Sequence, residues 1–310
     1  MAEDYGRGVA FVDGAYVPVD EARIPLLDWG FLRSDANQDT ISAWKGTYFR
    51  LDDHLDRFMR NIAKLRMVCP HDRDALKAIL DRCLSLTGFR DAYIQIIMTR
   101  GRPPIGVRDP RRCENKFYAF CIPYMWLGPE EQRERGLHLI VSEIRRVPPE
   151  SVDPTLKHYH WLDFEMGLFE AYDRGGDTVA LTDGDGNVAE GPGFNVFAIK
   201  DGILTTPERG VLDGMTRNTV FALCAETNLD YRTAPLSVAA LHDADEAFLS
   251  TTAGGLIPVT TVDGRPIGDG APGPVTRRLG ALYWSKREAG WLATPVDYNA
   301  VDSQKLRITT

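Results

Sequence analysis

The sequence predicts a protein of two domains, each of which combines helices with β-strands. Short extended runs alternate with turn dipeptides and with segments of helical periodicity along all 310 residues. This pattern breaks in the stretch Pro123 to Gly136, where proline, glycine and charged residues concentrate as in an interdomain linker. We therefore expect a smaller α+β domain over residues 1–124, a linker over 125–136 and a larger mixed α/β domain over 137–310.

The N-terminal half contains two hairpin signals and two helical periodicities. The pairs Asp13-Gly14 and Lys45-Gly46 follow extended runs and favour tight hairpin turns. Apolar residues recur at helical spacing over 52–67 and 72–87. Strands are expected at 9–12, 41–44, 47–50, 93–99 and 117–122, with a Gly/Pro/Arg-rich loop at 101–112.

The C-terminal half is predicted to contain five strands and two helices. Strand-like runs lie at 137–144, 178–181, 195–199, 203–205 and 247–250. Helices are expected at 216–226 and 274–286, and the pairs Asp201-Gly202 and Asp263-Gly264 mark hairpin turns. This half is therefore expected to form the larger mixed α/β domain.

Composition excludes several classes of protein. The chain carries 36 Lys and Arg against 44 Asp and Glu, a net charge of −8, whereas dedicated nucleic-acid binders are usually basic. Its N-terminus has no apolar run of the kind found in signal peptides, and no apolar segment is long enough to span a bilayer. We expect a cytoplasmic protein. Five cysteines without C-x-x-C spacing predict scattered thiols, and His158 and His160 lack the further ligands of a metal site.

Two separate segments carry residues suited to covalent cofactor chemistry. Lys157 stands among apolar and aromatic residues, where desolvation favours the neutral amine that forms a Schiff base with an aldehyde. Glu190 begins a Gly/Pro turn that leads into a buried strand, and a carboxylate paired with a pyridine nitrogen makes that ring an electron sink. Taken singly, these residues are better explained as a surface lysine and a turn-capping glutamate.

A third group of residues is suited to binding a phosphate. Arg57 lies on the first predicted helix, Gly214-Met215-Thr216 opens a later helix, and a glycine-rich turn with Thr251 and Thr252 follows a strand. Helix N-termini and glycine turns direct N–H groups at anions, and an arginine adds a bidentate fork. Each feature alone also fits an ordinary solvated or capping role. The sequence has neither a P-loop nor a G-x-G-x-x-G turn after a strand.

The order of these segments resembles the class IV (fold type IV) pyridoxal-phosphate aminotransferases, a family that includes branched-chain and D-amino-acid aminotransferases and (R)-selective amine transaminases. The resemblance covers nearly the whole chain. It rests on seven blocks, which are IPLLDWGFLRSD (24–35), FRLDDHLDRF (49–58), VDPTLKHYHW (152–161), LTDGDGNVAEGPGFNVF (181–197), GVLDGMTRNTV (210–220), STTAGGLIPV (250–259) and GPVT (273–276).

The resemblance implies a role for each matching residue. Lys157 is the catalytic residue, which holds the aldehyde of pyridoxal 5′-phosphate as a Schiff base, and Glu190 faces the pyridine nitrogen. The phosphate is held by Arg57, by the amides of Met215 and Thr216, and by Thr252. Leu212 packs against the ring and Thr251 lies beside the phosphate on the substrate side. The family also implies a cofactor between the two domains and a homodimer.

Among the subfamilies, RIPLLD, RLDDHL, EGPGFNV, TTAGG and the terminal PVDY are most similar to the (R)-selective amine transaminases. The implied substrates are an (R)-amine or D-amino acid and a keto acid such as pyruvate, in ping-pong kinetics. The alternatives are a branched-chain L-amino-acid aminotransferase, a lyase of the same fold such as aminodeoxychorismate lyase, and a cofactor-free relative that acts as a binding protein. The candidate substrate-binding residues are Arg33, Gln38, Tyr93, Arg108 and Trp161.

Three residues depart from the transaminase pattern. Gln38 stands where the (R)-selective enzymes carry tyrosine, and His160 and Leu162 replace a glutamine and a glycine around Trp161. The polarity of the substrate pocket is therefore expected to differ, which leaves α-amino acids as plausible substrates.

Overall fold

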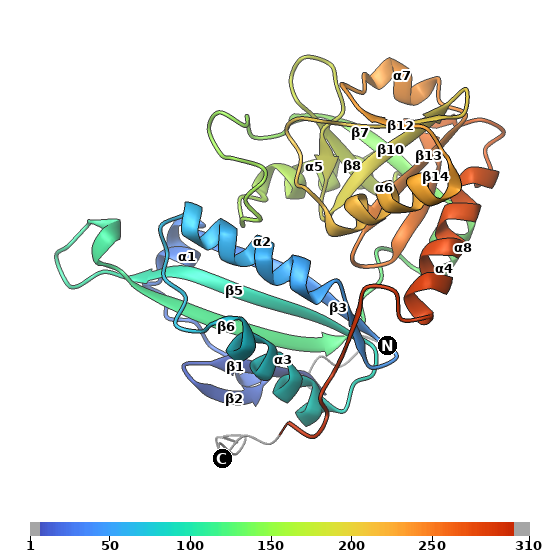
Figure 1. Ribbon diagram of the computed structural model, residues 1–310. Helices are drawn as coiled ribbons and strands as arrows, with labels where there is room; N and C mark the ends of the chain where they lie inside the picture. The colour runs from blue at the N-terminus through green and yellow to red at the C-terminus, as the bar shows by residue number, and fades with distance from the viewer. Residues whose placement is uncertain (1–6, 301–310) are drawn as a thin grey trace. The chain divides into compact units, whose positions relative to one another are not determined.

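A computed structural model describes residues 7–300 of the chain (Figure 1). These residues form two compact units. Unit 1 comprises residues 7–125, 157–159 and 290–300, and unit 2 comprises residues 126–156 and 160–289. Each unit is described by itself.

Unit 1 is built on a seven-stranded sheet in the order β16-β4-β3-β5-β6-β1-β2, in which every neighbouring pair is antiparallel. Its helices are α1 (Trp29–Arg33), α2 (Leu51–Lys64) and α3 (Arg73–Thr87). The strands are β1 (Val9–Val12), β2 (Ala15–Pro18), β3 (Ala36–Trp44), β4 (Thr47–Phe49), β5 (Ala92–Arg102), β6 (Glu114–Pro123) and β16 (Ala293–Pro295).

The two faces of this sheet have different chemistry. Side chains alternate across a strand, so that Ile94, Ile96 and Met98 of β5 enter the core formed with α2 and α3. Figure 1 shows these two helices lying along the sheet. The intervening residues of β5 and their partners on β3 point away from α2 and α3, onto what we call the second face. Gln38 and Thr40 of β3 lie there beside Gln95 and Ile97 of β5.

Unit 2 contains a nine-stranded mixed sheet in the order β12-β11-β10-β13-β14-β7-β8, with β9 paired to β10 and β15 to β14. Its helices are α4 (Glu130–Arg135), α5 (Leu162–Asp173), α6 (Met215–Thr227), α7 (Val238–His242) and α8 (Pro274–Glu288). The strands are β7 (Leu137–Arg145), β8 (Thr178–Thr182), β9 (Glu190–Gly191), β10 (Phe194–Lys200), β11 (Ile203–Thr206), β12 (Tyr231–Thr233), β13 (Glu246–Thr251), β14 (Gly255–Val262) and β15 (Arg265–Pro266).

The predicted mixed α/β fold class is confirmed, whereas the predicted domain bounds need two corrections. Residues 290–300 lie in unit 1 and not in a domain spanning 137–310, because β16 pairs with β4 and the peptide N–H of Val296 donates to Gly46. The segment 125–136, predicted as a linker, also belongs to unit 2 from residue 126 onward. It contains α4, whose Arg135 pairs with Asp177 of unit 2 at 2.8 Å.

Two further features concern the cysteines and the helices of the chain. All five cysteines are free thiols. Within residues 7–300, none of the helices combines the length and the apolar character that crossing a membrane requires.

Candidate active site

Lys157 is held on unit 1 by hydrogen bonds to both of its peptide groups. Its carbonyl accepts from the Gln38 peptide N–H at 2.8 Å and from the Asn37 side-chain amide at 2.9 Å. Its own N–H donates to the side-chain oxygen of Asn61 of α2 at 3.1 Å when the Asn61 amide is oriented to match the donors and acceptors around it. The adjoining His158 forms an antiparallel bridge with Asn37. The lysine backbone is thereby fixed to β3 on one side and to α2 on the other.

Arg57 lies in a fully buried polar cluster beneath this segment. Its Nε and Nη2 each donate to Asp39 of β3 at 2.8 Å, a bidentate ion pair. His54 lies one turn before Arg57 on the same face of α2 and places Nδ1 2.7 Å from the same carboxylate. Because a carboxylate only accepts, His54 Nδ1 carries the proton and donates it. Asp39 therefore orients both α2 side chains.

The charges of this cluster are set by burial and by pairing. Burial alone would raise the pKa of the Asp39 carboxyl, but Arg57 and His54 outweigh it and hold that pKa well below its ordinary value. Burial lowers the pKa of His54, and the positive charges of Arg57 and Lys157 act in the same direction against the attraction of Asp39. Asp39 is consequently ionised at neutral pH and His54 is neutral.

Glu190 occupies a buried position in unit 2, at the start of β9. One oxygen accepts from the Leu212 peptide N–H at 2.8 Å and the other from Arg146 Nε at 3.3 Å. Arg146 also pairs with Asp163 at 2.7 Å and lies over the Phe164 ring. These two donors fix the orientation of the buried carboxylate.

The turn that follows Glu190 requires glycine. A Cβ at Gly191 would lie 2.3 Å from the Val179 carbonyl oxygen, so that any larger residue would displace the backbone that carries Glu190. Gly193 has φ of +82°, its carbonyl accepts from the Thr251 hydroxyl at 2.9 Å, and the Trp161 ring lies beside it. The structure thus brings Glu190, Trp161 and Thr251 into one region of unit 2.

The predicted phosphate residues of unit 2 surround the first turn of α6. No side chain caps this helix at Gly214, where a Cβ would lie 2.2 Å from the Asn195 amide oxygen. Asn195 also donates to the Leu212 carbonyl at 2.9 Å, which connects this turn to the residue bonded to Glu190. Met215 and Thr216 begin the helix and are buried, whereas Thr252 is half-buried. A 13-residue helix whose N-terminus lacks a side-chain cap is suited to an anion.

The remaining candidates for substrate binding are distributed unevenly. Gln38 is buried on the second face of unit 1, and Tyr93 lies on the same face with its hydroxyl 3.5 Å from that of Thr40. Arg33 stacks on the Trp29 ring at 3.5 Å, at the end of α1, and Arg108 is exposed in the loop between β5 and β6. Leu162 is the exposed first residue of α5. Trp161 belongs to unit 2.

Sequence reasoning missed residues that act through pairing between elements. His54 precedes Arg57 by three positions, a spacing that places both on one helix face and could have been recognised. Asp39, Asn61 and Arg146 gave no comparable signal, because their partners become neighbours only when β3, α2 and β9 pack. In the part of the chain that the structure describes, no group of three or more His, Cys, Asp or Glu residues is placed to hold a metal ion.

Comparisons with known proteins identify the family of this chain. The family model for amino-transferase class IV matches residues 38–262. A branched-chain-amino-acid aminotransferase from Pseudomonas aeruginosa is 32% identical over 241 residues, covering 76% of this chain and 77% of that protein. A D-alanine aminotransferase from Bacillus licheniformis is 26% identical over 269 residues, covering 86% and 93%.

A solved structure is also similar over nearly the whole chain. The T.th. branched-chain amino acid aminotransferase, in complex with N-(5′-phosphopyridoxyl)-L-glutamate, has a TM-score of 0.86 at 28% identity and covers 94% of this chain and 99% of its own. The same enzyme has been solved with pyridoxamine 5′-phosphate and with 4-methylvaleric acid.

The chain therefore belongs to the class IV aminotransferases. It is an aminotransferase whose cofactor is pyridoxal 5′-phosphate. The residues of this chain fit that cofactor, since unit 2 presents a buried carboxylate and a helix N-terminus without a side-chain cap, and unit 1 presents a lysine whose backbone is fixed. The specific residue assignments remain predictions.

The buried His54 is predicted to make the protein less stable in mild acid. Its pKa is lowered in the folded state, so the unfolded chain binds this proton more readily once pH falls below about 6.5. The contribution of His54 to the free energy of unfolding should fall by up to about 1.4 kcal/mol per pH unit below that value. Urea denaturation between pH 7.5 and pH 5 measures it.

The control is His54→Asn, whose side-chain amide can donate to Asp39 without titrating. This variant should show a weaker pH dependence than the unmodified protein, whereas His71→Asn, on a partly buried histidine outside the cluster, should retain the His54 contribution. An identical slope in His54→Asn and the unmodified chain would contradict the assignment.

Proposed function

We propose that this enzyme transfers an amino group from an (R)-amine or a D-amino acid to a keto acid such as pyruvate, in a ping-pong reaction in which Lys157 is the catalytic residue. The observation that carries the proposal is the fixation of the Lys157 backbone by Gln38, Asn37 and Asn61 in a chain of the class IV family. Pyridoxal 5′-phosphate would supply the aldehyde that binds the amino group and the ring that accepts the electrons of the substrate carbanion.

Lys157 acts twice in this scheme. Its Nζ would bind the cofactor aldehyde until an amino donor takes its place, and the released amine would then move the proton from the carbon that bears the donor's amino group. Both steps require the amine to return to one position. The three hydrogen bonds to its peptide groups limit the motion to the side chain itself.

Glu190 and the anion-binding groups hold the cofactor. Glu190 would accept a hydrogen bond from the protonated ring nitrogen, and Arg146 and the Leu212 N–H keep the carboxylate oriented for that contact. Arg57, which Asp39 orients through Nε and Nη2, would contribute its positive charge to the phosphate site, together with the Met215 and Thr216 amides and Thr252. Leu212 would pack against the ring, with Thr251 on the substrate side.

The donor preference rests on the sequence blocks shared with (R)-selective amine transaminases. Arg33, Gln38, Tyr93, Arg108 and Trp161 would contact the substrate, and the exposed Arg108 would pair with the carboxylate of a keto acid. A branched-chain L-amino-acid aminotransferase is the second candidate, favoured by the 32% identical Pseudomonas aeruginosa relative and by the structures of the T.th. enzyme. A cytoplasmic location stays a prediction of the sequence.

We further propose a homodimer, which exposed apolar side chains support. One face of α5 exposes Leu162, Met166, Phe169 and Tyr172 at helical spacing, with Phe169 64% exposed. In unit 1, the segment 24–32 exposes Ile24, Leu26, Leu27, Phe31 and Leu32. Contiguous apolar surface of this kind is costly in water, and a second copy of the chain would cover it.

Replacing Lys157 by alanine should abolish both cofactor attachment and amino transfer. The purified holoenzyme should show visible absorbance and incorporate tritium from borohydride, and Lys157→Ala should lose both, with kcat reduced at least about 10³-fold through loss of the catalytic base. Lys200→Ala, at an exposed lysine paired with Asp243 and Asp245, is the matched control and should behave as the unmodified enzyme. Normal amino transfer by Lys157→Ala would refute the proposal.

A donor panel separates the two candidate specificities. (R)-1-phenylethylamine, D-alanine and L-leucine are each supplied with pyruvate, and with L-leucine the assay is repeated with 2-oxoglutarate. The proposed function predicts kcat/KM for one of the first two donors at least about tenfold above that for L-leucine, a difference of about 1.4 kcal/mol in transition-state stabilisation. Activity confined to L-leucine would establish the branched-chain alternative.

The dimer should dissociate when charge is placed on the apolar face of α5. The double variant Leu162→Glu/Phe169→Glu should elute and scatter as a monomer, because two carboxylates cannot be buried there without partners. Arg277→Glu, at an exposed position on α8, changes one charge away from this face and should leave the mass at twice that of the chain. Light scattering at several concentrations measures the mass, and a monomeric unmodified protein would contradict the proposal.

A further inference from the structure

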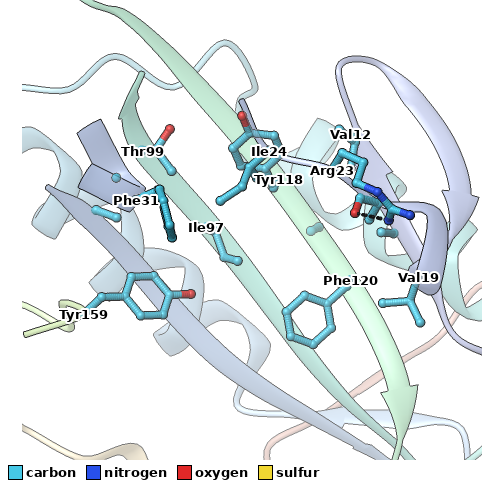
Figure 2. A pocket seen from close by; sticks show the side chains of 15 residues that line it. Val12, Val19, Arg23, Ile24, Phe31, Ile97, Thr99, Tyr118, Phe120 and Tyr159 are labelled. Carbon is cyan, nitrogen blue, oxygen red and sulfur yellow. Dashed lines mark hydrogen bonds between the residues drawn. The ribbon is translucent and has the colours of Figure 1, made fainter. Parts of the chain in front are cut away.

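A cavity of about 400 Å³ opens over the second face of unit 1, and its walls are mainly apolar. Ile97 of β5, Phe120 of β6 and Phe31 of α1 contribute the large side chains, and Tyr159 closes one end. Figure 2 shows Phe31, Ile97 and Phe120 between Tyr159 at one end and Arg23 at the other. A volume of this size suits a small organic ligand.

A cluster of neutral polar side chains adjoins the Tyr159 end. The Tyr159 hydroxyl donates to the Gln95 amide oxygen at 3.1 Å, and the Gln95 amide nitrogen donates to the Gln38 amide oxygen at 3.2 Å. The Thr40 hydroxyl donates to the same Gln38 oxygen at 3.1 Å. Burial raises the pKa of Tyr159 and of the adjacent Tyr93, so both phenols stay neutral. We call Gln38, Thr40, Gln95 and Tyr159 the neutral cluster.

The neutral cluster is tied to the segment that carries Lys157. Tyr159 follows the lysine by two residues and belongs to the same short stretch of unit 1. Gln38 contributes its side chain to the cluster and its peptide N–H to the Lys157 carbonyl. Tyr159 and Gln38 thus connect the neutral cluster, and through Tyr159 the cavity, to the backbone of the lysine segment.

Charge is nearly absent from these walls. Arg23 is the only charged residue among the described residues that line the cavity. Its Nη1 donates to the carbonyls of Asp20 and Ala22 in its own loop, at the end opposite Tyr159. A carboxylate that entered beside Gln95 would lose water and meet amides and hydroxyls that already bond one another, which is unfavourable for a charge without a counter-ion.

We propose that the neutral cluster and the cavity select the substrate side chain, so that the enzyme takes amino donors and keto acids with a bulky apolar substituent and discriminates against those with a second carboxylate. This inference rests on the proposed function. Gln95 and Tyr159 determine the discrimination against a charged substituent. Ile97 and Phe120 determine the preference for a bulky apolar substituent. The T.th. enzyme, by contrast, has been solved with a glutamate adduct of the cofactor, which carries such a second carboxylate.

The test compares two keto acids of similar length in single turnovers. The pyridoxamine form of the enzyme is mixed with 4-methyl-2-oxopentanoate or with 2-oxoglutarate, and the cofactor absorbance reports the reaction. The unmodified enzyme should favour the apolar acid by at least about tenfold in the second-order rate constant. Gln95→Arg should shift this ratio about ten- to a hundredfold toward 2-oxoglutarate, because a guanidinium binds the distal carboxylate through charge-assisted hydrogen bonds.

Matched variants separate charge from disruption of the cluster. Gln95→Leu removes the same hydrogen bonds without adding charge, so its rate constant with 2-oxoglutarate should not increase. Gln95→Glu should discriminate against 2-oxoglutarate further. Ile97→Trp fills the cavity and should lower the rate constant for 4-methyl-2-oxopentanoate relative to that for pyruvate at least about tenfold. Equal ratios in Gln95→Arg and Gln95→Leu, or equal use of both acids by the unmodified enzyme, would overturn the inference.

Equilibrium binding gives a readout that needs no turnover. Calorimetric titration of the holoenzyme with 4-methylvaleric acid and with glutarate, neither of which has an amino or keto group, should show the same preference and the same change in Gln95→Arg. A failure of the proposed function is distinguishable, because the cofactor absorbance would then respond to no amino donor or keto acid. Equal rates with the apolar keto acid and with 2-oxoglutarate would contradict only the present inference.

Discussion

The fixation of Lys157 to unit 1 is the constraint on which the rest of the site depends. The residues on either side of the stretch 157–159 belong to unit 2, yet this stretch is bonded to β3 and α2. An amine on an unrestrained loop would sample many positions and lose most of the advantage of proximity. Three hydrogen bonds to its peptide groups remove that freedom while they leave the side chain able to move a proton.

The buried acidic side chains of the site are stabilised by the donors that surround them. Asp39 is completely buried and would be costly alone, but Arg57 and His54 surround it with donors, so that one carboxylate orients two side chains of α2. Unit 2 uses the same solution at Glu190, which is matched by Arg146 and the Leu212 N–H. In unit 1 the buried Asp39 positions Arg57, a proposed phosphate ligand, and in unit 2 Arg146 and the Leu212 N–H position Glu190, which is itself a proposed cofactor ligand.

The proposed specificity has a different physical origin from the proposed catalysis. Arg57 and Glu190 are each paired with an opposite charge, whereas the second face of unit 1 carries amides, phenols and hydrocarbon. A distal carboxylate gains nothing there to offset its desolvation, while an apolar group gains by leaving water. A single strand, β5, carries this selection through Gln95 and Ile97, while its alternate residues build the core.

The sequence by itself determined the family, the fold class and most strands and helices, because turn dipeptides, apolar periodicity and ordered motifs are local properties. It also singled out Lys157, Glu190 and Arg57 as candidates. Tertiary structure alone decided that β16 returns to unit 1, that Asp39 and His54 orient Arg57, that Arg146 faces Glu190, and that Tyr159 meets Gln95. The paired residues are far apart in the chain, and they become neighbours only through strand pairing and helix packing, which leave no periodic trace in the sequence.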